Sequence, residues 1–489
     1  MIKTSRIHPS WATRHKRPGT ELRCIKDRYY LYEYKTVYDA SKKRARKISG
    51  KILGSITQQA GFIPSAKRMV ESSAGHGAAS SKKILVKEFG MARLVSEKFL
   101  AYGKKLENYF GALYKELLAI AYCRFVYKCP LKNIPFRLES SFLPELLSFS
   151  AFNEKTASGI LNKIGAMTEA MQDYMKSFID KSDYILIDAT HVLSHSQQMP
   201  IARRGYNTQL NFDTQFNLLY IYSATGRMPV FYRLLPGNIR EVKAFKNILL
   251  QAGLKKSIIV ADKGFYSKAN IDLLVAEKLQ FILPLKRDNQ LIDYQSLTSN
   301  TFKGLGTFFI HEKRTIWCRR YVSENMLLHL FLDESLRVKE ENDYLTRITT
   351  HPEEYSMKGY HEKRNTLGSL ALLTNIKSEN SEEIYQTYKS RMEIEVMFDG
   401  MKNVLEADHT YMQNQQTLEG WMFINHLCLQ WYQQLYIELK EKKLLKKISV
   451  NDYIYSLTDI KKVNINGTWH LNEFTHATAK LLKAVGIQI

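Results

Sequence analysis

The chain has 489 residues and a formal net charge of +23, from 71 Lys and Arg against 48 Asp and Glu. This length suffices for several domains with a sizeable core, and the charge favours a polyanionic partner such as DNA. The sequence holds no apolar N-terminal signal segment, no CxxC pair and no Walker-type phosphate loop. We therefore expect a cytoplasmic protein with reduced thiols and without a nucleotide cofactor.

The basic charge is concentrated near the N-terminus, where the first 100 residues contain 22 Lys or Arg and 7 Asp or Glu. The Tyr-rich run 20–38 and the run 47–56, which follows the basic stretch 42–47, predict a small β-hairpin element. The Ser/Gly/Ala-rich stretch 72–81 predicts a loop or linker. We expect salt-dependent DNA binding here. A solubilising basic tail is the alternative, and a membrane surface is not favoured because the stretch does not form one amphipathic helix.

Helical patterns fill residues 87–125 and 153–179, with Asn153 as a predicted N-cap. The second pattern carries an apolar stripe, formed by Ala157, Ile160, Leu161, Ile164, Met167 and Met171. Residues 147–165 fit part of a helix-turn-helix, and they fit equally a helical bundle that packs on another domain.

Two acids follow strand-like apolar runs. Tyr184–Ile187 leads to Asp188, and Ser257–Ala261 leads to Asp262 and then to Gly264. Such runs indicate strands buried on both faces of a largely parallel sheet, whose carboxyl ends are common positions for functional sites. A capping or turn role is the alternative for each Asp. The further predicted elements are strands 215–223 and 229–235, helix 242–252, helix 268–278 and strand 281–285. Together they predict a mixed sheet with helical cover.

The segment from residue 288 to 368 is longer than a bare three-layer core requires. Runs 307–310 and 315–322 are rich in β-branched and aromatic residues, so the segment is predicted to be a β-rich insertion. Trp317 lies in the second of these runs, where cross-strand packing is its simplest role.

Tyr388, Arg391, Glu395 and Lys402 lie in a segment, 382–403, that is predicted to be a helix. At helical spacing their side chains fall within about 60° of one another. A stripe that aims one carboxylate between two cations suits a metal ion and a phosphate. The alternative is a solvated charged face.

Residues 420–439 are strongly apolar and aromatic but are interrupted by Asn425, His426, Gln and Glu. They are predicted to be part of the core and not a membrane span. The last segment, 441–489, shows helical stretches and a basic cluster at 442–447.

Asp188, Asp262 and Glu395 would form an oxygen-only site. Hard cations such as Mg²⁺ prefer this donor set and take further ligands from substrate phosphates. Two such ions can activate a water or a DNA 3′-hydroxyl and stabilise the leaving oxygen of a displacement at phosphorus.

These residues resemble a known family. Asp188 in Ile-Asp-Ala-Thr, Asp262 in Val-Ala-Asp-Lys-Gly-Phe-Tyr-Ser, and the Tyr388, Arg391, Glu395 and Lys402 spacing are similar to the DDE transposases of bacterial insertion sequences. More narrowly, they resemble the group-four type with a Tyr-Arg-Glu-Lys signature. The resemblance covers about residues 183–422 and includes the Pro236-Gly237-Asn238 turn.

The resemblance implies an α/β fold with a ribonuclease-H-like catalytic core that the β-rich insertion interrupts. It implies that Asp188, Asp262 and Glu395 bind two Mg²⁺ ions, for which Mn²⁺ can substitute. Arg391 and Lys402 would contact DNA phosphates near the cleaved end, with a polar contact from Tyr388. An aromatic residue such as Trp317 could stack on a flipped base. The partners implied are element ends and target DNA, bound by a homodimer.

On this basis the chain is predicted to comprise six regions. They are a basic β-hairpin-containing region (1–71), a helical DNA-binding region (82–180), the first part of the catalytic core (181–287), the β-rich insertion (288–368), the second part of the core (369–439) and a C-terminal helical region (440–489).

Two other functions and one other kind of site are consistent with parts of the sequence. The first is a structure-specific nuclease of the same fold without strand transfer. The second is a transposase-derived DNA-binding protein without chemistry, against which the intact Asp188, Asp262 and Glu395 argue. The third is a zinc site at His191 and His195, although no helical zinc motif surrounds them.

Overall fold

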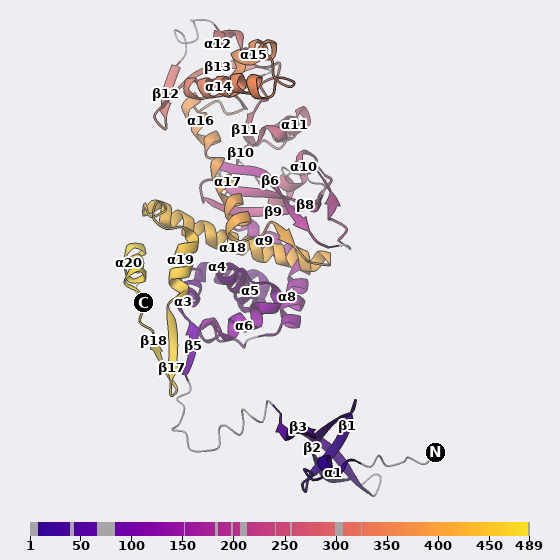
Figure 1. Cartoon of the computed structure of the whole chain (residues 1–489). Coiled ribbons are helices and arrows are strands. Elements are labelled where there is room, and N and C mark those ends of the chain that lie inside the picture. Colours follow the sequence, from indigo (N-terminus) through magenta and orange to yellow (C-terminus); the bar gives the residue numbers. More distant parts are fainter. Residues whose placement is uncertain are drawn as a thin grey trace. The chain divides into compact units, whose positions relative to one another are not determined.

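The chain forms two compact units, Met1–Lys83 and Ile84–Ile489 (Figure 1). In this computed structural model the described residues are 8–39, 44–65, 84–150, 152–180, 184–196, 199–205, 213–239, 241–254, 257–298, 307–323 and 325–487. The predicted linker at 72–81 lies outside them.

The first unit is a four-stranded antiparallel sheet in the order β1-β2-β3-β4, so the predicted hairpin is confirmed as part of a larger sheet. Its elements are α1 (Ser10–Thr13), β1 (Thr20–Ile25), β2 (Arg28–Asp39), β3 (Arg44–Thr57) and β4 (Gly61–Pro64). One face of the sheet buries a small core against α1. This core comprises Ala12, Leu22, Leu31, Leu53 and Ile56, with Trp11, Tyr29 and Phe62 packed at its margin.

The second unit begins with a strand and a group of helices. The predicted helical pattern at 87–125 forms three helices, and its first two residues belong to β5 instead. Asn153 caps α8 as predicted, since its side chain accepts a hydrogen bond from the Thr156 backbone amide. The elements are β5 (Ile84–Glu88), α3 (Gly90–Glu97), α4 (Leu100–Phe110), α5 (Tyr114–Tyr127), α6 (Ile134–Glu139), α7 (Leu143–Leu147), α8 (Glu154–Ala166) and α9 (Thr168–Lys176).

An 11-stranded mixed sheet forms the centre of this unit. Its first strands are β6 (Tyr184–Ser194), β7 (Arg203–Arg204), β8 (Thr214–Ser223), β9 (Met228–Pro236), β10 (Ile258–Ala261) and β11 (Gln280–Pro284), with α10 (Glu241–Ala252) and α11 (Lys268–Ala276) between the later ones. β9, β8 and β6 are antiparallel neighbours, whereas β6, β10 and β11 run parallel. The predicted order of strands and helices from residue 184 to 285 is confirmed, and the protein is of the mixed α/β class.

The segment predicted as an insertion continues the same sheet through β15, in the order β12-β13-β14-β15-β11. It also contains helices that the sequence analysis did not predict. Its elements are α12 (Gln295–Thr298), β12 (Thr307–His311), β13 (Arg314–Ser323), β14 (Met326–Asp333), α14 (Glu334–Thr350) and α15 (Met357–Lys363), followed by β15 (Ser369–Thr374).

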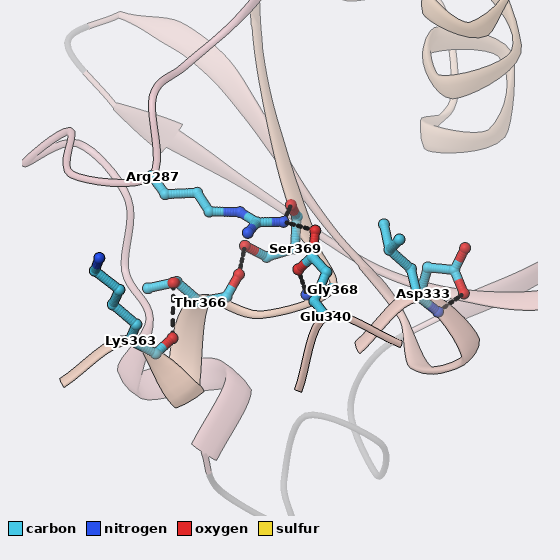
Figure 2. A network of polar contacts seen from close by, with 8 residues as sticks. Arg287, Asp333, Glu340, Lys363, Thr366, Gly368 and Ser369 are labelled. Carbon is cyan, nitrogen blue, oxygen red and sulfur yellow. Dashed lines mark hydrogen bonds and ion pairs between the residues drawn. The ribbon is translucent and has the colours of Figure 1, made fainter. Parts of the chain in front are cut away.

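Polar contacts attach α14 to this end of the sheet (Figure 2). The helix has no buried residue. The Glu340 carboxylate accepts a hydrogen bond from the Gly368 amide at 2.8 Å and pairs with Arg287 at 2.9 Å. Arg287 also donates to the Ser369 carbonyl at 3.2 Å. Because Gly368 adopts a φ of +71° and precedes β15, this network fixes the entry of the chain into the strand.

The long helix α18 (Gln415–Glu441) lies between the sheet and the N-terminal helices (Figure 1). It contacts β9 on one side and α5 and α8 on the other. A Cβ on Gly165 of α8 would lie 1.7 Å from the Gln416 carbonyl oxygen, so the two helices meet backbone to backbone. This packing is that of a helical bundle.

In the part of the chain that the structure describes, no helix is both long and apolar enough to cross a membrane.

The C-terminal segment differs from its helical prediction. It contains α19 (Val450–Thr458) and α20 (His476–Val485), but also the hairpin β17 (Lys461–Ile465) and β18 (Thr468–Leu471). β17 pairs with β5 from the start of the unit. A strand whose partner lies some 370 residues earlier in the chain gives little local signal, and this explains the missed prediction.

Candidate active site

Asp188 lies on β6, and Asp262 directly follows β10, the parallel neighbour of β6. The pairing of β6 with β10 ends at Ile187 and Ala261, so each acid is the first residue beyond the shared edge. The prediction that Asp188 ends its strand was wrong, because β6 continues to Ser194 through its other neighbour, β8. Neighbouring strands lie about 4.8 Å apart, so the two carboxylates nevertheless lie close together where the pairing of β6 with β10 ends.

The segment that carries the other predicted residues is not one uninterrupted α-helix. α16 (Ser381–Lys389) ends before Arg391, α17 spans Met392–Asp399, and a π-helical turn, η5, covers Gly400–Val404. The turn begins where Gly400 meets the Tyr432 ring, which lies 2.3 Å from the position of a Cβ on this glycine. A π-helical turn changes the angular spacing of side chains, so Lys402 does not keep the position that regular helix spacing predicts.

Arg391 is the centre of the site. Its guanidinium nitrogens lie 2.8 Å from an Asp188 oxygen, 3.1 Å from a Glu395 oxygen and 3.7 Å from an Asp262 oxygen. Three acids that span more than 200 residues of sequence therefore converge on one cation. Two of the distances are within hydrogen-bonding range, and a planar guanidinium suits such multiple contacts.

Burial sets the electrostatics of Asp188. Its side chain is 16% exposed, whereas those of Asp262 and Glu395 are 35% and 46% exposed. Burial raises the pKa of Asp188 to about 6, even though the Arg391 charge and the Ala189 amide favour the carboxylate. Burial also works against the charge on Arg391, but Asp188 and Asp262 outweigh it and raise the guanidinium pKa.

Tyr388 and Lys402 flank this cluster. Burial raises the pKa of Tyr388, whereas the nearby Arg391 charge acts in the opposite direction. Lys402 lies on η5, where burial lowers its pKa while Asp408 and Glu395 act in the opposite direction.

His191 is a neighbour that the sequence analysis considered only as a zinc ligand. Burial lowers its pKa, and the Lys402 charge acts in the same direction. Its spacing of three residues from Asp188 along a strand gives no distinctive sequence signal. The zinc hypothesis fails on geometry, because four residues of extended strand separate His191 from His195 by about 13 Å. The His195 ring instead stacks on Tyr411, with ring centroids 4.7 Å apart.

Trp317 lies away from the three acids. It is on β13, five strands from β6 in the sheet order, which corresponds to roughly 24 Å. Its ring packs against Phe308 of β12 with centroids 5.3 Å apart, so cross-strand packing is the role that its contacts show.

Carboxylate oxygens are the donor type that hard divalent cations prefer. Three carboxylates at one edge of the sheet already surround a positive charge, and Glu395 and Asp262 are open to solvent. Among the described residues, no group of three or more His, Cys, Asp or Glu side chains is arranged to hold a metal ion. The central position between the acids belongs to the Arg391 guanidinium.

Comparisons with known proteins identify the family. The family model of the transposase DDE domain matches residues 180–431, the stretch that contains all three acids and Arg391. No curated protein matches the chain. Among solved structures, the chain is similar to a piggyBac transposase synaptic complex with hairpin DNA, determined by cryo-EM.

That similarity is 11% in sequence identity, with a TM-score of 0.36 over 71% of this chain and 70% of that chain. At this TM-score it supports no structural argument. The family match covers more than half of the 489 residues, and its domain contains the clustered acids. The chain belongs to the family of proteins with a transposase DDE domain.

Proposed function

We propose that the chain is a DNA transposase of the group-four insertion-sequence type. It would bind the ends of its element, cleave them by metal-dependent phosphodiester hydrolysis and join the freed 3′-hydroxyl to target DNA. The observation that carries the proposal is the convergence of Asp188, Asp262 and Glu395 on Arg391. A structural ion pair needs one acid for one arginine, and a third acid is in excess of that need.

Each side chain of the site has a role in the proposed chemistry. Asp188, Asp262 and Glu395 would hold two Mg²⁺ ions, or Mn²⁺, which activate the attacking oxygen and stabilise the leaving oxygen at phosphorus. Arg391 would pair with a phosphate of the cleaved strand, because its fork of donors matches phosphate as well as carboxylate. Lys402 would contribute a second positive charge, and Tyr388 would add a polar contact to the DNA near the cleaved end.

The strand order supports a ribonuclease-H-like assignment for the core. Three antiparallel strands, β9, β8 and β6, are followed by the parallel strands β10 and β11, with α10 and α11 in the connections. We retain the predicted division of the chain into a basic N-terminal region, a helical DNA-binding region, a catalytic core in two parts around the insertion and a C-terminal region as part of the proposal.

One assay separates the transposase from its alternatives. Labelled DNA from the element end is incubated with a target plasmid, the protein and Mg²⁺. Joined products support a transposase, cleavage alone supports a nuclease, and a gel shift without cleavage supports a DNA-binding protein that performs no chemistry. The Glu395→Gln variant should remove both cleavage and joining, and Glu393→Gln is the matched control because that side chain contacts Tyr222 and Lys440 instead.

A further inference from the structure

In the first unit β2 and β3 extend beyond the other two strands of the sheet and form a two-stranded ribbon. β1 pairs with β2 only as far as Glu33, and β4 pairs with β3 only from Gly54 onward. Apart from the Tyr34 amide, which donates to the Gly19 carbonyl at 2.9 Å, the strand segments 34–39 and 44–49 pair with each other alone, in unbroken antiparallel register from Tyr34–Ser49 to Asp39–Arg44. An isolated pair of strands has little stability of its own in water, so such a ribbon gains from a partner surface.

Irregular pairing marks the base of the ribbon. The register between β2 and β3 shifts between Leu31 and Tyr32 and again between Tyr32 and Tyr34. Gly50 of β3 lies here, and a Cβ on it would be only 3.0 Å from the Glu33 Cβ. Bulges of this kind increase the right-handed twist and redirect the strands. These shifts separate the ribbon from the four-stranded part of the sheet that holds the core.

The two faces of the ribbon differ in chemistry. Alternation along the strands places Lys35, Val37, Arg44, Arg46 and Ile48 on one face. All five are exposed, and Val37 and Ile48 are each 50% exposed. This face, which we call the Arg44 face, combines three cations with two aliphatic side chains.

The opposite face carries Tyr34, Thr36, Lys47 and Ser49, and the Lys47 ammonium lies 4.3 Å from the centroid of the Tyr34 ring. Within segments 34–37 and 44–49, no described side chain is acidic. The sequence places one acid in the ribbon, Asp39, opposite Arg44. Both faces therefore carry basic residues. The Arg44 face exposes the branched aliphatic side chains of Val37 and Ile48, whereas the only aliphatic side chain that the described residues expose on the opposite face is the small one of Ala45.

We propose that this ribbon enters the major groove of duplex DNA with the Arg44 face toward the base edges. The inference rests on the proposed function, which makes DNA the substrate. The major groove, about 12 Å wide, accommodates a two-stranded ribbon. There Arg44 and Arg46 meet guanine acceptors or phosphates, and Val37 and Ile48 meet thymine methyl groups. The charge matches the polyanion, and the minor groove of undistorted B-DNA, at about 6 Å, is only half as wide as the major groove.

The test uses full-length protein and a labelled duplex of mixed sequence, with affinity measured over a range of salt. Arg44→Gln/Arg46→Gln should weaken binding about tenfold or more and reduce the slope of log affinity against log salt by up to about 1.8. Arg14→Gln/Lys16→Gln removes the same charge from the same unit outside the ribbon, and should change the affinity less. Val37→Thr/Ile48→Thr keeps β-branched side chains and charge, and should weaken binding without changing the salt slope.

Dimethyl sulfate footprinting reports the groove directly, because it methylates guanine N7 in the major groove. The proposal expects protection by the wild type that the Arg44/Arg46 variant loses. The proposal is overturned if guanine N7 is not protected, or if the Arg14/Lys16 control loses as much affinity as the Arg44/Arg46 variant. It is also overturned if the ribbon variants change only the oligomeric state, because a second copy of the chain would then cover the Arg44 face. Cleavage is measured on the same preparations. Cleavage that persists without N7 protection overturns the ribbon proposal alone, and N7 protection without cleavage overturns the transposase chemistry alone.

Discussion

Arg391 and Asp188 are 203 residues apart in the sequence, and the Arg391 guanidinium donates to the Asp188 carboxylate at 2.8 Å. This contact joins the segment between α16 and α17 to the middle of β6, and it brings Glu395 to the edge of the sheet where Asp262 lies. The same guanidinium therefore holds the three acids together and offsets part of their negative charge. Substitution of Arg391 should therefore change protein stability, cation binding and DNA binding, and each effect can be measured on its own.

Glu395→Gln should abolish cleavage and leave DNA binding intact. The amide keeps the size of the side chain but cannot supply an anionic ligand, so the rate should fall by more than about a hundredfold. Single-turnover cleavage and a gel shift on the same preparation measure the two effects. Nicking near the wild-type rate would refute the role of Glu395, and the Glu393→Gln control should cleave normally.

Arg391→Ala should weaken binding to the cleaved DNA end. Each lost phosphate contact should make the slope of log affinity against log salt shallower by about 0.9. Fluorescence anisotropy at several salt concentrations measures this slope. An unchanged slope contradicts a phosphate contact, and Arg347→Gln, at an exposed ion pair elsewhere, should leave it unchanged.

Arg391→Gln should also change the response of protein stability to divalent cations. Without the guanidinium the three carboxylates repel one another, so the melting temperature should fall in chelator. Mn²⁺ should then raise it more than in the wild type, because a cation that binds only the folded state at 100 times its Kd contributes about 2.7 kcal/mol. Differential scanning fluorimetry with and without Mn²⁺ tests this. Equal Mn²⁺ shifts in both proteins would show that Arg391 does not compete with cations.

Gly165→Ala should destabilise the protein strongly. The new methyl group would lie 1.7 Å from the Gln416 carbonyl oxygen, so α8 and α18 must separate, at a cost of about 3 kcal/mol or more. Gly159→Ala, on the same helix, meets nothing within 4 Å and should instead stabilise the protein by about 0.5–1 kcal/mol. Urea unfolding compares the two. Similar effects of both substitutions would contradict close packing of these helices.

Glu88 should make stability depend on pH. Burial raises its pKa to about 7, against hydrogen bonds from Tyr122, Met91 and Ala92. Because the pKa of Glu88 in the folded protein is above the usual 4.5, the protonated carboxyl contributes to the free energy of unfolding. This contribution is fully present below about pH 4.5 and is lost as the pH rises through about 7. The loss is on the order of 3 kcal/mol. Urea unfolding from pH 5 to 8 should show a decline that Glu88→Gln lacks, and parallel pH profiles would contradict it.

The sequence by itself determined the residues of the candidate site and most elements that carry them. The apolar runs before Asp188 and Asp262 form β6 and β10, because strands buried on both faces must be continuously apolar. The segment 382–403 was predicted to be helical and contains most of α16 and all of α17, since helical periodicity depends on neighbouring residues.

Only the tertiary structure decided how these pieces meet. Strand pairing extends β6 beyond Asp188, contact with Tyr432 accompanies the π-helical turn at Gly400, and the pairing of β17 with β5 adds a sheet that no local pattern predicts. The place of Arg391 among three acids is likewise a contact between distant segments. Neighbouring residues determine the backbone preference of a segment and which of its faces is apolar. Strand register, the close approach of two helices and the clustering of charged side chains depend on residues that are distant in the sequence and meet only in the folded chain.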